Sequence, residues 1–132
     1  ERENYFNQKF NIIGDFDFMM KISKYANAKG FNEPLINYRA HKKNFSKLNN
    51  KMFFEEYKEW FNKQSENINP NFEKNKKYFL IKLNELEIIY NLYERKSFNL
   101  LNKILKIPKI SLKIKFLLAF FLPSKLINYL RK

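Results

Sequence analysis

Apolar side chains recur three or four positions apart along several stretches of the chain, and this spacing predicts α-helices. The first predicted helix runs over Asp15–Ala28, about three or four turns, with Asp15 placed to cap its start and Gly30 just past its end. Its apolar members are Phe18, Met19, Ile22, Tyr25 and Ala26. The next segment, Phe31–Arg39, contains Pro34 and is expected to be extended or a short edge strand.

Three further helices are predicted downstream. Lys47–Gln64 is expected to place Glu55, Glu56, Lys58 and Glu59 opposite an apolar face made of Leu48, Met52, Phe53, Tyr57, Trp60 and Phe61. A turn around Pro70 leads to Phe72–Arg95, whose apolar residues are Phe79, Leu83, Leu86, Tyr90 and Tyr93. Ser97 can cap a following helix that carries Phe98, Leu101, Ile104 and Leu105.

The last segment, Ile110–Leu130, contains a dense apolar block at Phe116–Leu122 that is framed by basic residues. The block stops at Pro123, well short of the roughly 20 residues that a membrane-spanning helix needs. Two accounts stay open: the segment lies in a membrane interface, which the basic frame favours, or it packs on the rest of the protein or on a missing domain. Under either account Phe116–Leu122 is expected to have little contact with water.

Length and composition narrow the class of protein. The 132 residues suffice for one modest domain, and the start at Glu1 without Met is expected for a fragment or a processed piece. Zero Cys excludes disulfides and thiolate chemistry, and fits the cytosol. The net charge of +13 would attract anionic surfaces, although a solvated Lys-rich surface is the simpler interpretation, because Lys, Asn, Ile, Phe and Tyr are abundant throughout.

Two carboxylates and the only His are the candidates for chemistry. Asp15 and Asp17 are two residues apart, so on a regular helix they point to nearly opposite sides. Each also has a structural explanation, because carboxylates cap helices and are favoured in the first turn. His41 suits a metal, acid–base chemistry or a loop, and Arg39 suits a phosphate or an ion pair. Residue types and spacing leave these alternatives open.

Three motifs follow one another in the first third of the chain. They are Gly14-Asp15-Phe16-Asp17, Pro34-Leu35-Ile36-Asn37-Tyr38-Arg39-Ala40-His41 and Asn44-Phe45-Ser46. Their order and separation resemble the carboxyl-terminal part of the catalytic domain in family 2 glycosyltransferases, which are inverting enzymes of the GT-A fold. In that family a Glu-Asp-Tyr-Asp-like turn opens a helix lining the acceptor site. A Pro-Leu-x-x-Tyr-Arg-x-His segment follows and often continues to Asn-x-Ser.

The resemblance implies a role for individual residues. Asp15 falls on the catalytic base, which takes the proton from the acceptor hydroxyl as it attacks the anomeric carbon of a nucleotide-activated sugar. Asp17 and Arg39 are the implied substrate-binding residues, and Lys42 would lie close to phosphate charge. His41 falls where many members place a His near the metal and the diphosphate, so it is a candidate ligand for Mg²⁺ or Mn²⁺.

The chain also departs from the family pattern. Gly14 stands where a Glu usually precedes the base, Lys21 stands where an Arg is usual, and nothing matches the amino-terminal nucleotide-binding half with its Asp-x-Asp motif. The expected fold is a mainly α fragment of an α/β (GT-A) fold, with an acceptor-side helix and a short extended segment followed by a helical extension. The expected divisions are residues 1–46 (catalytic domain end), 47–107 (helical extension) and 108–132 (basic amphipathic tail).

The resemblance implies transfer of a sugar from a nucleotide-sugar donor to a glycan or lipid-linked acceptor, with inversion, in cell-surface polysaccharide or glycolipid synthesis. A divalent cation, bound largely by the missing half, would assist, and the fragment alone is not expected to be active. The expected location is the cytoplasmic membrane's inner face, as a peripheral protein. The alternative is a non-enzymatic basic helical module that binds an anionic membrane surface or a protein. Nucleic acid is not expected, because no reading motif is recognisable.

Overall fold

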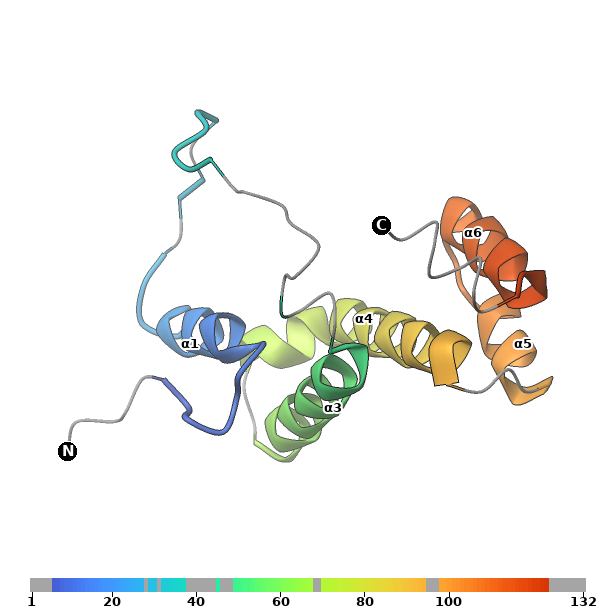
Figure 1. Ribbon diagram of the computed structural model, residues 1–132. Coiled ribbons are helices and arrows are strands. Elements are labelled where there is room, and N and C mark those ends of the chain that lie inside the picture. The colour runs from blue at the N-terminus through green and yellow to red at the C-terminus, as the bar shows by residue number, and fades with distance from the viewer. Residues whose placement is uncertain are drawn as a thin grey trace. The chain divides into compact units, whose positions relative to one another are not determined.

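The computed structural model describes residues 6–27, 29–30, 32–37, 45, 49–67, 70–94 and 98–123. Within these ranges the chain is mainly helical and contains no strand, as Figure 1 shows. The helices are α1 (Gly14–Ile22), α3 (Asn50–Glu66), α4 (Pro70–Glu94), α5 (Phe98–Leu105) and α6 (Ile110–Phe121). The prediction of a mainly α chain is therefore confirmed.

The chain divides into two compact units, Glu1–Asn71 and Phe72–Lys132. We call them the amino-terminal unit and the carboxyl-terminal unit. The sequence analysis divided the chain by expected role, into residues 1–46, 47–107 and 108–132. That division remains a prediction.

Helix α1 is shorter than its apolar spacing predicted, because it ends at Ile22 and not near Ala28. Beyond Ile22 the N–H groups of Lys24 and Tyr25 donate to carbonyls three residues back, at 3.3 and 2.8 Å, so the α-helical ladder gives way to a turn. Tyr25 and Ala26, expected on the apolar face, are both exposed. Residues 23–27 are all exposed, so little packing stabilises another turn of helix there.

Helix α3 buries Tyr57 and Trp60 as its spacing predicted, while Glu55, Lys58 and Glu59 are exposed. Glu56 is the exception. It was expected on the polar face, but it is buried together with Tyr57 and Trp60. This assignment to the polar face was wrong because Glu56 shares the helical register of the apolar residues, and a partner elsewhere in the amino-terminal unit compensates its charge.

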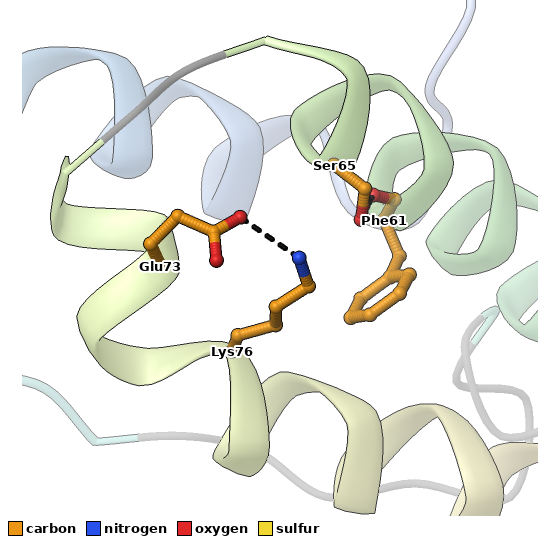
Figure 2. A network of polar contacts seen from close by, with 4 residues as sticks. All are labelled: Phe61, Ser65, Glu73 and Lys76. Carbon is orange, nitrogen blue, oxygen red and sulfur yellow. Dashed lines mark hydrogen bonds and ion pairs between the residues drawn. The ribbon is translucent and has the colours of Figure 1, made fainter.

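Helix α4 begins at Pro70, which was expected to lie in a turn. A proline suits the first position of a helix, since the N–H that it lacks would have no intrahelical partner there. Near this start Lys76 forms an ion pair with Glu73 at 2.8 Å, the dashed line in Figure 2. The Lys76 ammonium also lies 5.7 Å from the centre of the Phe72 ring, which is stacked on Phe79.

The main core cluster of the carboxyl-terminal unit is aliphatic apart from one aromatic ring. Its buried members come from α4, α5, the α5–α6 connection and α6: Ile88, Leu92, Leu100, Ile104, Ile107 and Phe116. Sequence spacing predicted Ile104, but beside it the spacing selected Leu101 and Leu105, whereas Leu100 is the second buried residue described in α5. Ile88 and Leu92 of α4 were also missed, because an apolar residue lies on nearly every side of that helix and spacing alone does not identify the buried side.

Helix α6 packs one side on this core and exposes the other. Phe116 is buried, and Leu112, Leu117, Ala119 and Phe120 pack against the core cluster. Leu118 and Phe121 are 63% and 75% exposed, so the described part of the chain does not itself cover the whole Phe116–Leu122 block. The helix ends before Pro123, as predicted. Among the described helices, none combines the length and apolarity needed to cross a bilayer.

Candidate functional site at the start of α1

The candidate base, Asp15, lies in the first turn of α1 and is exposed. The helix begins at Gly14, with its first bond from the Asp17 N–H to the Ile13 carbonyl at 2.8 Å. Asp15 is thus the second residue of the helix and not its cap, which corrects the expectation from the sequence. Its Oδ1 accepts a hydrogen bond from the Phe16 N–H at 2.7 Å. This bond orients the carboxylate while leaving other acceptor positions of the group to solvent or a ligand.

Asp17 lies on the opposite side of the same turn, as the two-residue separation predicted. It is only 3% exposed, and its Oδ2 lies 2.9 Å from the Lys21 ammonium one turn further along α1. Lys21 is the residue that stands where the resembling family usually has Arg. In this chain the two residues form an ion pair within α1, and Asp15 is the more accessible of the two carboxylates.

The segment before α1 is held by the buried carboxylate of Glu56 from α3. Glu56 Oε1 accepts the Asn11 N–H at 2.8 Å, and Oε2 accepts the Ile12 and Ile13 N–H groups at 2.9 and 3.2 Å. The side-chain amide of Asn11 adds a longer contact to Oε1 at 3.4 Å. Three successive N–H groups thus converge on one carboxylate, an arrangement that we call the Glu56 clamp. Hydrogen bonds to a charged acceptor are among the stronger ones in proteins.

Aromatic packing also supports the first turn of α1. The Phe16 ring lies edge-on to Trp60 with ring centres 4.7 Å apart, and its centre is 5.7 Å from that of Tyr57. Phe6, in the segment that precedes the clamp, stacks on Phe18 of α1 at 4.3 Å. In the sequence Phe16 lies between Asp15 and Asp17. Because its ring packs on α3, it helps fix the direction of both carboxylates.

The arrangement provides one accessible carboxylate on a supported turn. Asp15 can accept a proton from a hydroxyl that approaches within hydrogen-bonding distance, about 2.6–3.2 Å. The Glu56 clamp and the Phe16 contacts fix the backbone on either side of Asp15. Such support matters for a base, because the rate of proton transfer depends steeply on placement.

The other predicted site residues, Arg39, His41 and Lys42, lie outside the described residues. The structure therefore does not bring them together with Asp15 or separate them from it. In the described ranges no group of three or more His, Asp or Glu side chains could hold a metal ion. The proposed metal role of His41 stays a prediction.

Sequence reasoning missed Glu56, although a signal was present. Glu56 follows Phe53 by three positions and precedes Trp60 by four, so it occupies the register of the apolar face of α3. A carboxylate in such a register must find donors or remain strongly penalised by burial. The sequence alone does not show that the donors are the backbone N–H groups of residues 11–13.

No protein-family model, curated protein or solved structure matches the chain.

Proposed function

We propose that this chain is the carboxyl-terminal part of an inverting family 2 glycosyltransferase of the GT-A fold, with Asp15 as the catalytic base. The observation that supports the proposal is the exposed Asp15 carboxylate in the first helical turn, on a backbone anchored by the Glu56 clamp. The motif order from Gly14 to Ser46 supplies the reaction class by resemblance.

In the proposed reaction an Asp15 carboxylate oxygen takes the proton of the acceptor hydroxyl. The hydroxyl oxygen forms a bond to the anomeric carbon of the donor sugar, and the bond from that carbon to the diphosphate oxygen breaks on the opposite side. The nucleoside diphosphate leaves with its electron pair, and the configuration at the anomeric carbon inverts. Arg39 would contact the substrates. Asp17, which is buried and ion-paired with Lys21, would instead support the turn that carries Asp15. His41 and the missing amino-terminal half would hold the divalent cation that offsets the charge of the leaving group.

The decisive experiment substitutes Asp15→Asn in the full-length protein. We expect sugar transfer to fall by about 10²- to 10⁴-fold, the usual contribution of a general base, while binding of the nucleotide-sugar donor is unchanged. Transfer would be measured with radiolabelled donor, and donor affinity by calorimetry. Glu55→Gln on the exposed face of α3 is the matched control and should leave both quantities unaltered. Retained turnover in Asp15→Asn would remove Asp15 from the role of base.

The upstream reading frame tests the proposal independently of activity. A strand-rich region carrying Asp-x-Asp is expected ahead of Glu1, because the GT-A fold needs it for the nucleotide and the metal. A gene that begins near Glu1 would contradict the enzyme and favour a basic helical module instead.

A further inference from the structure

A row of large apolar side chains lies exposed along α6, on the side turned away from the core. Ile110, Ile114, Leu118 and Phe121 are 71%, 53%, 63% and 75% exposed, and we call them the outer row. They are spaced by four, four and three positions, so they form one continuous stripe on the helix. The core-facing residues of α6 form the opposite stripe. The helix therefore has two apolar faces, and the described residues of its own unit cover only one of them.

Basic residues border the outer row. At about 100° of rotation per residue, Lys115 and Lys113 fall on opposite edges of the stripe, and Lys115 is exposed. Lys109 is exposed directly before the helix. The charge is one-sided over a longer range, since residues 95–132 contain ten Lys and Arg but no Asp or Glu. The surface thus combines an apolar stripe with cationic edges. Residues 95–132 contribute no acidic side chain to it.

From these features we propose that the outer row of α6 docks on an anionic lipid bilayer, lying parallel to its plane. A helix of 12 residues is about 18 Å long, too short to cross a hydrocarbon core of about 30 Å but suited to the interface. The outer row enters the acyl boundary while the flanking Lys side chains remain among the phosphates of the headgroups. A second copy of the chain fits less well, because pairing two outer rows would bring like-charged edges together.

The proposal concerns a different surface from the candidate base and is independent of the proposed enzyme activity. It also combines the accounts of the tail that the sequence left open. The Phe116 side of α6 packs on the protein, and the Leu118 side is available to lipid. Both accounts apply to the same helix, each to one of its faces.

The test is co-sedimentation of the whole chain with vesicles of phosphatidylcholine, with and without phosphatidylglycerol. We expect binding only when phosphatidylglycerol is present, with affinity falling as salt rises. The triple variant Ile114→Gln, Leu118→Gln, Phe121→Gln should lower the partition coefficient at least about tenfold, because three apolar side chains lose their transfer to lipid. Lys115→Gln should lower it about fivefold.

Two controls separate docking from misfolding and from general charge. Leu80→Gln alters an exposed apolar residue of α4, and Lys77→Gln removes an exposed charge of α4; both should bind vesicles nearly as the parent chain does. Helix content by circular dichroism should be unchanged in all variants, since every substituted side chain is exposed. The absence of Cys allows a fluorophore at Leu118→Cys, whose emission should shift to the blue on anionic vesicles while that at Leu80→Cys should not.

Equal binding by the parent and the triple variant would overturn the proposal, as would no binding of the parent chain to anionic vesicles. A concentration-dependent dimer that the triple variant abolishes, without vesicle binding, would assign the outer row to a second copy. Binding to an acidic protein or to nucleic acid that depends on the outer row, again without vesicle binding, would assign it to that partner.

Discussion

The amino-terminal unit buries two carboxylates, Asp17 and Glu56, whereas every residue described as buried in the carboxyl-terminal unit is apolar. Asp17 is paired with Lys21 within α1, whereas the burial of Glu56 is explained by an irregular stretch of backbone. Residues 11–13 lie outside helices, and their N–H groups need an acceptor, which Glu56 supplies. The carboxyl-terminal core joins helices whose backbones are satisfied internally, so aliphatic side chains suffice. Irregular structure near the candidate base is thus held by polar contacts that are more specific than apolar packing.

The largest expected effect comes from opening a cavity in the aliphatic core. Ile104 is fully buried in α5, and Ile104→Ala should lower the free energy of unfolding by about 3 kcal/mol. Leu105→Ala, its half-exposed neighbour on the same helix, is the matched control and should cost well under half as much. Urea unfolding followed by circular dichroism measures both variants. Similar losses would mean that burial does not distinguish the two positions.

The next effect tests the buried carboxylate of the amino-terminal unit. Glu56→Gln keeps the shape but removes the charge and presents an NH₂ group towards backbone donors. We expect unfolding to become easier by about 2 kcal/mol, because at least one buried N–H loses its acceptor. Hydrogen exchange should accelerate at residues 11–13 and in α1. Glu55→Gln, on a residue whose side chain is 59% exposed, should change little. If the two variants behave alike, the Glu56 clamp contributes nothing to stability.

The smallest expected effect concerns Gly14, where the resembling family usually has Glu. A Cβ at Gly14 would meet no atom within 4 Å apart from its chain neighbours and the backbone of its own helix, so a side chain can begin there without a clash. We expect it to stabilise the chain by about 0.5 kcal/mol, through better helix propensity and a negative charge at the helix start. Gly14→Lys shares most of the propensity gain but opposes the dipole, so thermal unfolding should rank it below Gly14→Glu. The reverse order would show that the start of α1 is not governed by its dipole.

Spacing was informative about which helices form and less so about their ends and their buried sides. The long periodic stretches predicted α3 and α4 close to their observed limits. The predicted last turn of α1 depended on Tyr25 and Ala26 being buried, and in the structure both are exposed. In α5, Leu100 and Leu101 are adjacent and chemically identical, so only the position of the partner helices decides that Leu100 is buried.

In the candidate site, too, the sequence predicted the local features but not the long-range contacts. The sequence supplied Asp15 by motif order and predicted that Asp15 and Asp17 face different ways, which follows from helical geometry alone. It did not supply Glu56 as the partner of residues 11–13, because that contact joins positions more than 40 residues apart in the chain. Contacts of this range depend on how α1 and α3 pack, which no local pattern encodes.

The sequence by itself determined the helical character of the chain, its basic charge and the apolar content of its last helix, since each depends on local spacing or composition. Only the tertiary structure decided that Glu56 is buried, that Asp15 is exposed and that α6 presents one apolar face to the core and the other to the outside. The physical reason is that burial depends on which surfaces meet, and a surface meets its partner only once the chain has folded.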